Sequence, residues 1–296
     1  MKEGDHLHHY RIVELLGKGG TGEVYAAVDT RLGRLVALKR IRGDRSDMAV
    51  RRLLREARAA AAFEHPNVVT LYDIGEDEGA PYIAMEHVRG RTLRGFIGNA
   101  ALPMTRRLRW LIDVGRALGA AHRAGLVHRD VKPDNVMVRD DGVIKVLDFG
   151  IARRASLNEG AGGSPLIGTV TEEGVVVGTR RYASPEQLRA AKFDGRSDQF
   201  SWAVMAYELI VGVMPWDCHD TLELLSQIIY SEPPPMATRA LGASTSPDAG
   251  APPLEVPAEV EAAVLRAMAK SAEDRFPTID EAADALEPFA EVTRLD

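Results

Sequence analysis

Four short motifs, in one order and at sensible intervals, constrain this chain more than any other feature of its sequence. They are GKGGTGEV at 17–24, VALK at 36–39, HRDVKPDN at 128–135 and LDFG at 147–150. Each motif alone is weak, because a glycine pattern also marks dinucleotide-binding folds and an isolated Asp-Phe-Gly is more often a turn than a site. The joint occurrence of all four favours a functional explanation over a purely structural one.

The glycine motif can be interpreted through its surroundings. Glycines let backbone N–H groups approach phosphates closely, where a Cβ would block them. The motif lies between two strand-like segments, RIVELLGKGG and EVYAAVDT, whereas the dinucleotide fingerprint opens a helix. Taken by itself, the motif supports a phosphate cradle and a simple hairpin turn about equally.

Lys39 ends an apolar strand-like segment, RLVALK. A lysine is costly to bury there without a partner. Glu56, on the following helical stretch, could supply the carboxylate. If this pair stood alone, a lysine reaching solvent at a strand edge would be the better interpretation.

The pattern of apolar residues changes along the chain. Strand-like segments dominate the first 85 or so residues, including HPNVV, LYDIGED and PYIAMEHV, with one helix in MAVRRLLREARAAAAF. Helical patterns follow, in 105–125 with Gly125 as the stop, and in 198–212, 220–232 and 257–270. The 198–212 helix is apolar enough to be buried on most sides. Residues 233–253 are rich in proline, alanine and serine, and we expect an irregular connection there.

Composition excludes several classes of protein. The 296 residues carry a formal net charge of −6, which argues against a general binder of nucleic acid or anionic membrane. Cys218 is the single cysteine, so no intramolecular disulfide can form and a reducing compartment fits. No apolar run approaches the ~18 residues that would span a bilayer. We therefore expect a cytoplasmic chain with no membrane segment and no nucleic-acid partner.

Together the motifs resemble those of the eukaryotic-like (Hanks-type) bacterial Ser/Thr protein kinase catalytic domain. HPNVV, YIAMEHVRGRTL and GTRRYASPEQL add to the resemblance, which runs from about Tyr10 to Phe289. It implies an α+β, bilobal protein-kinase fold. Residues 1–88 would form a small N-lobe with an antiparallel sheet and one helix. Residues 89–296 would form a larger, mainly helical C-lobe with the catalytic loop and an activation segment at 148–186.

The resemblance also implies roles for single residues. Asp130 accepts or orients the proton of the substrate hydroxyl, and Lys132 neutralises charge on the transferring group. Asn135 and Asp148 ligate Mg²⁺, or Mn²⁺ in its place. Lys39, oriented by Glu56, holds the α- and β-phosphates of ATP. The implied ATP-contacting residues are Gly17, Lys18, Gly19, Gly20, Thr21, Gly22, Val24, Ala37, Lys39, Met85, Glu86, Val88, Met137 and Asp148.

Other matching positions imply scaffold roles. Glu186 would pair with Arg275, and Asp198 would hold the backbone near His128 and Arg129. Side chains that stack between the lobes of active kinases correspond here to Ala60, Leu71, His128 and Phe149. Ala60 is small where a larger aliphatic residue is usual, and the long side chain of Met85 could fill the gap. We expect the helix at 48–63, which carries Ala60, to be loosely held. This would lower the basal activity.

The stretch TVTEEGVVVGT lies in the implied activation segment. Thr171, and next Thr169, are the predicted autophosphorylation sites, where a phosphate could pair with Arg129. Thr179 and Lys132 have the form of Ser/Thr rather than tyrosine kinases. The expected function is therefore transfer of the ATP γ-phosphoryl group to Ser or Thr of protein substrates. A homodimer for autophosphorylation is compatible with this function, and so is a longer, membrane-anchored chain. The alternative is a pseudokinase that acts as a nucleotide-binding scaffold.

Overall fold

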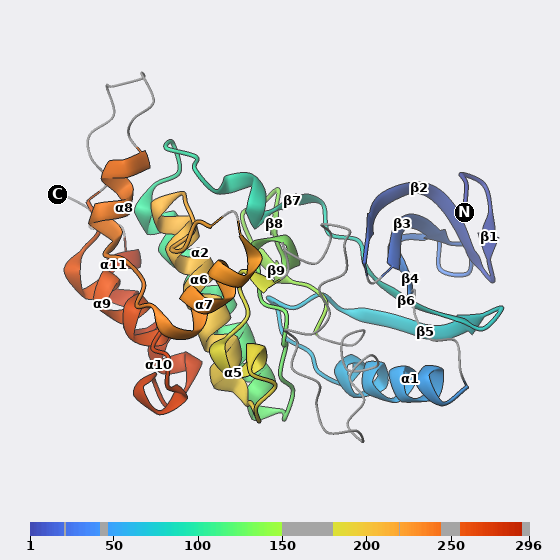
Figure 1. The fold of residues 1–296 in the computed structure, drawn as a ribbon. Helices are drawn as coiled ribbons and strands as arrows, with labels where there is room; N and C mark the ends of the chain where they lie inside the picture. The colour runs from blue at the N-terminus through green and yellow to red at the C-terminus, as the bar shows by residue number, and fades with distance from the viewer. Residues whose placement is uncertain (21, 42–46, 150–179, 219, 244–254, 292–296) are drawn as a thin grey trace.

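The computed structural model describes residues 1–20, 22–41, 47–149, 180–218, 220–243 and 255–291, without the side chains of 47–49, 52, 53, 56, 59 and 240–243. A strand-rich lobe formed by the first part of the chain lies beside a larger helical lobe formed by the rest (Figure 1). The α+β, bilobal fold expected from the sequence is confirmed.

The first lobe is built on a six-stranded antiparallel sheet in the order β1-β2-β3-β4-β6-β5. Its strands are β1 (His6–Leu7), β2 (Tyr10–Gly19), β3 (Gly22–Asp29), β4 (Arg34–Ile41), β5 (Leu71–Asp77) and β6 (Ala80–Glu86). Tyr10 and Ile12 alternate with the exposed Arg11, the period-two pattern of a sheet with one face in the core. Helix α1 (Asp47–Ala61) packs beside β5, with Ala57 buried in the contact. The expected helix at 48–63 is therefore confirmed.

The second lobe begins with a small sheet of three strands, β7 (Gly90–Thr92), β8 (Val136–Arg139) and β9 (Ile144–Val146). Two 3-10 turns, η1 (Leu93–Phe96) and η2 (Pro133–Asn135), adjoin it. The larger helices are α2 (Met104–Arg123), α6 (Gly195–Val211), α7 (Thr221–Tyr230), α8 (Met236–Ala243) and α9 (Ala258–Ala267). Shorter elements are α5 (Pro185–Leu188), η4 (Ala272–Asp274), α10 (Ile279–Asp284) and α11 (Glu287–Ala290).

Helix α6 is the centre of the second lobe. Every residue from Ser197 to Val211 is buried, as its continuous apolar sequence predicts. Helices α2, α8, α9 and α10 pack against it. Helix α2 ends just before Gly125, whose φ of +76° is the left-handed conformation expected of a glycine that stops a helix.

Two expectations about local structure were wrong. HPNVV is not a strand: within it only Val68 makes an isolated bridge, to Val146, and the Asn67 side chain donates to the Ile144 carbonyl at 3.1 Å. These contacts tie the segment to β9 rather than to the first sheet. Residues 236–243, expected to be irregular, form α8. The completely buried Met236 anchors this helix, and its N–H donates to Glu261 Oε1 at 2.7 Å.

The part of the chain that the structure describes contains no helix both long and apolar enough to cross a bilayer.

Candidate active site

The glycine motif forms the turn between β2 and β3, and its glycines meet different demands. At Gly17, Gly19 and Gly20, no atom beyond the adjacent residues lies within 4 Å of the place a Cβ would take, so this backbone is open to a ligand. At Gly22, where φ is +151°, a Cβ would stand 2.1 Å from the Arg40 carbonyl oxygen. Gly22 is thus required by the close approach of β4, whereas the other three leave room for phosphate. Thr21 lies outside the described residues.

Lys39 and Asp148 meet between the lobes, although they are far apart in sequence. Lys39 is 6% exposed, and its ammonium donates to Asp148 Oδ2 at 2.6 Å. Asp148 has a φ of +52°, an uncommon conformation for a residue other than glycine. The carboxylate is the partner that a buried lysine requires. Glu56 lies on α1, but its side chain is outside the described part of the structure.

Four of the expected ATP-contacting residues belong to one apolar cluster or pack against it. Ala37 and Met85 are buried and adjacent across β4 and β6, and Val24 and Val88 pack against the same cluster. Met137 lies on β8, outside this cluster.

The backbone N–H of Glu86 donates to the Thr70 carbonyl at 2.8 Å. This bond restricts any adenine contact of Glu86 to its carbonyl. The Glu86 side chain makes an ion pair that the sequence interpretation missed. Lys145 on β9 is 7% exposed, and its Nζ lies 2.8 Å from Glu86 Oε2. The sequence did contain a signal for this pair, because Lys145 lies within the short apolar segment IKV. A lysine buried in such a segment requires an acceptor.

The catalytic-loop residues form one hydrogen-bonded unit. Asp130 Oδ2 accepts from Lys132 Nζ at 2.8 Å and from Asn135 Nδ2 at 3.0 Å. Asn135 Nδ2 also donates to the Asp130 carbonyl at 2.7 Å. Because both bonds of Asn135 use its nitrogen, its amide oxygen is the atom that could ligate a cation.

Asp198 fixes the backbone that carries Asp130. Its carboxylate is fully buried and accepts from the N–H groups of His128 and Arg129, each at 2.7 Å. His122 Nε2 lies 2.8 Å from the same carboxylate. Arg129 has a φ of +69°, a conformation that costs about 1–3 kcal/mol and persists only where the surrounding structure enforces it. The predicted role of Asp198 in holding this backbone is confirmed.

Of the four side chains expected to stack between the lobes, His128 and Phe149 are in contact with each other. The rings of His128 and Phe149 lie 4.8 Å apart, and His128 Nε2 lies 2.7 Å from the Leu147 carbonyl oxygen. Phe149 also meets Phe63 edge-on at 6.0 Å, a contact that sequence reasoning missed. In the first lobe, Ala60 and Leu71 pack against the apolar cluster that contains Met85.

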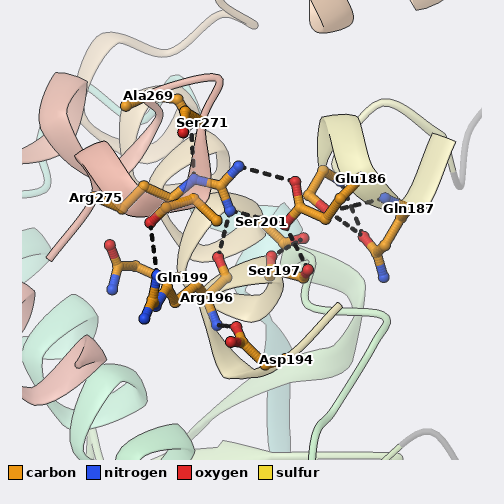
Figure 2. A network of polar contacts seen from close by, with 12 residues as sticks. Glu186, Gln187, Asp194, Arg196, Ser197, Gln199, Ser201, Ala269, Ser271 and Arg275 are labelled. Carbon is orange, nitrogen blue, oxygen red and sulfur yellow. Dashed lines mark hydrogen bonds and ion pairs between the residues drawn. The ribbon is translucent and has the colours of Figure 1, made fainter. Parts of the chain in front are cut away.

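A buried ion pair supports the segment that follows the activation region (Figure 2). Arg275 is 2% exposed and makes two parallel bonds to Glu186, at 2.8 and 2.9 Å. Burial alone would raise the pKa of Glu186, but its bonds to Arg275 and Ser197 lower it overall. Ser184 and Gln187 cap α5 reciprocally. The predicted Glu186–Arg275 pair is confirmed.

The chemistry of these residues fits Mg·ATP. Open glycine backbone suits phosphate, the Ala37 and Met85 cluster offers an apolar surface to a base, and Lys39 provides a cation. The Asn135 amide oxygen and the Asp148 carboxylate are hard oxygen ligands, the type that Mg²⁺ prefers.

Thr169, Thr171 and Thr179 lie outside the described residues. The Arg129 guanidinium lies 5.0 Å from the centre of the Phe193 ring.

Comparison with known proteins shows the family to which the chain belongs. The protein kinase domain family matches residues 10–282, and the chain therefore belongs to the protein kinase family, as the resemblance predicted. The crystal structure of the Mycobacterium tuberculosis PknI kinase domain superimposes with a TM-score of 0.71. It is 29% identical in sequence, and the match covers 97% of this chain and 99% of that one.

Two bacterial relatives of the chain are named serine/threonine-protein kinases. It is 39% identical over 284 residues to the "Probable serine/threonine-protein kinase PknB" of Bifidobacterium longum. It is 39% identical over 280 residues to the "Serine/threonine-protein kinase PknB" of Mycobacterium tuberculosis. Each match covers 92% of this chain, but only 38% and 41% of the respective relative. The chain thus spans about two fifths of the length of these relatives.

Proposed function

We propose that this chain is an active protein kinase domain that transfers the γ-phosphoryl group of ATP to serine or threonine hydroxyls of proteins. The observation that carries the proposal is the unit formed by Asp130, Lys132 and Asn135, together with the Lys39–Asp148 pair. A pseudokinase scaffold would not need these groups held together. Residues 1–88 are proposed as the ATP-binding lobe and residues 89–296 as the lobe that binds the protein substrate.

Bound Mg·ATP supplies the phosphoryl group and much of the charge neutralisation. Lys39 holds its phosphates, and Asn135 and Asp148 hold the metal through oxygen atoms. Asp130 orients the acceptor hydroxyl and takes its proton at a carboxylate oxygen. Lys132, whose ammonium lies 2.8 Å from that carboxylate, neutralises charge on the transferring group. Catalysis by this site is therefore mainly positioning and electrostatics.

Regulation and cellular context are part of the same proposal. Phosphorylation of Thr171, and next of Thr169, would place a phosphate where the cationic Arg129 could pair with it. Autophosphorylation between two copies of the chain would supply this phosphate. The domain would act in the cytoplasm, by itself or as the cytosolic part of a longer membrane-anchored protein.

The test is incubation with Mg·ATP and a generic protein substrate, followed by mass spectrometry of phosphosites. Wild-type chain should phosphorylate Ser and Thr, and Asp130→Asn should reduce the rate at least about 100-fold. Binding of nucleotide by wild-type chain without phosphate transfer would instead support the scaffold. Thr171→Ala should reduce activity without abolishing it, because Glu173, two residues later in the sequence, partly supplies the negative charge of a phosphate. Unchanged activity in Thr171→Ala would exclude this site as the activating one.

A further inference from the structure

A network of charges lies directly beside the catalytic loop, and neither the catalytic nor the ATP-binding proposal uses it. Arg94, on η1, is at its centre. Its Nη1 lies 2.7 Å from Glu208 Oε1, and its Nη2 lies 2.9 Å from Asp134 Oδ2. Nη2 also donates to the Tyr182 hydroxyl at 2.6 Å. One arginine thus bridges two carboxylates and a phenol from three separate segments of the second lobe.

The position of this network connects it to the substrate. Asp134 lies on η2 immediately before Asn135, whose side chain is bonded to Asp130. Tyr182 lies immediately before the Ala183–Ser184 pair that leads into α5. A peptide that brings its hydroxyl to Asp130 therefore passes near these groups. The Asp134 side chain is 50% exposed and that of Arg94 is 38% exposed, so both can be reached from solvent.

Arg94 is held in this place by the fold. Leu93, next to it, is fully buried, and Thr92 pairs with Met137 across β7 and β8. An arginine carried on such an anchored turn loses less freedom in binding than one that arrives on a flexible peptide. The chain thus provides its own guanidinium for the two carboxylates.

The charges of the network do not cancel. Burial, followed by the neighbouring Glu208, raises the pKa of Tyr182, so its hydroxyl stays neutral and donates to Glu208. Arg94 then balances only one of the carboxylates Asp134 and Glu208. Without Arg94, the half-exposed Asp134 carboxylate and the buried Glu208 carboxylate beside it would have no cation from η1. Carboxylates of this kind bind arginine with bidentate, charge-assisted bonds.

We propose that Arg94 is a specificity-determining residue: it occupies, from within the chain, a carboxylate pair that would otherwise select basic residues near the phosphoacceptor. Wild-type chain therefore shows little preference for arginine in its substrates. Removing Arg94 converts the enzyme into one that selects arginine. The inference rests on the proposed kinase function, because it concerns the peptide that this function requires.

The test measures binding as well as phosphorylation. Fluorescent serine peptides with arginine placed at each flanking position in turn are compared with the alanine peptide by fluorescence anisotropy. Wild-type chain should bind both kinds within about twofold. Arg94→Met should bind the arginine peptide about tenfold more tightly at one position, and salt should weaken this gain. Phosphorylation rates of the same peptides should follow the same ratio.

Arg94→Met leaves the buried Glu208 carboxylate without its cation and can unfold the chain, so a second variant is needed. Arg94→Met/Glu208→Gln removes that buried charge and leaves the half-exposed Asp134. It should retain part of the gain, and adding Asp134→Asn should abolish it. Arg91→Met is the matched control, because Arg91 is exposed on β7 and lies over the Phe96 ring.

The inference is overturned by any of three results. One is a wild-type chain that already prefers the arginine peptide about tenfold. The second is unchanged preference in both Arg94 variants, and the third is an equal gain in Arg91→Met. Binding ratios decide the question even if no peptide is phosphorylated. A failure of the proposed kinase function would appear separately, as an absence of phosphate transfer by wild-type chain.

Discussion

The ion pair between Glu186 and Arg275 allows a quantitative test of how the second lobe is held together. Arg275 is 2% exposed, and all three of its nitrogens donate: besides Glu186, they reach the carbonyls of Ala269, Arg196 and Lys270. Glu186→Gln keeps the shape of the side chain but removes the negative charge. The guanidinium is then buried without a counterion, which typically costs about 3–5 kcal/mol. Each kcal/mol lowers Tm by about 2–4 °C in a domain near this size.

We therefore expect Glu186→Gln to lower Tm by at least about 6 °C, measured by calorimetry or circular dichroism. The control is a double-mutant cycle with Arg275→Met. In the Arg275→Met background, Glu186→Gln should cost little, because the charge that it would leave alone is already gone. If Glu186→Gln lowers Tm equally in both backgrounds, the two side chains are not energetically coupled and the reasoning is refuted.

The same pair predicts a pH dependence. The pKa of Glu186 is lowered from its ordinary value of 4.5, because the bonds from Arg275 and Ser197 outweigh the effect of burial. A group with a lowered folded pKa stabilises the protein above its unfolded pKa, and the contribution is lost as pH falls through the folded value. The difference in Tm between wild type and Glu186→Gln should be constant above about pH 5 and should shrink below about pH 4. A difference that grows in acid would contradict the assigned sign.

Three further substitutions test the site. Asp198→Ala removes the acceptor of the buried His128 N–H and of the partly buried Arg129 N–H. A buried N–H left without an acceptor costs about 1–3 kcal/mol, so the phosphorylation rate and Tm should both fall. Unchanged activity would contradict the supporting role of Asp198. Gly22→Ala should lower stability and nucleotide affinity, because its Cβ would stand 2.1 Å from the Arg40 carbonyl oxygen. Thermal shift with and without Mg·ATP measures both effects. A variant as stable as wild type would exclude that clash. Ala60→Leu should raise the basal phosphorylation rate of unphosphorylated chain, because a larger side chain adds apolar contact between α1 and the Met85 cluster. No change in this rate would count against a loosely held helix.

Local sequence determined much of this protein. The glycine hairpin, α1, the buried α6 and the stop at Gly125 follow from periodicity and from glycine conformation, which act between neighbouring residues. The motif HRDVKPDN marked Asp130 and Asn135 as candidates, and the resemblance to protein kinases gave them and Lys132 their roles. These three residues stand close together in sequence, and their side chains are hydrogen-bonded to one another. Asp198 and the Glu186–Arg275 pair were found only through resemblance to a family.

Other features depended on contacts between distant parts of the chain. The Lys39–Asp148 bond, the Lys145–Glu86 pair and the Arg94 network each join residues that no periodic pattern connects. Helix α8 was missed for the same reason, because a buried methionine and a distant carboxylate stabilise it rather than propensity alone. A sequence shows that a buried charge requires a partner, but only the tertiary structure selects the partner, because packing decides which carboxylate lies within reach.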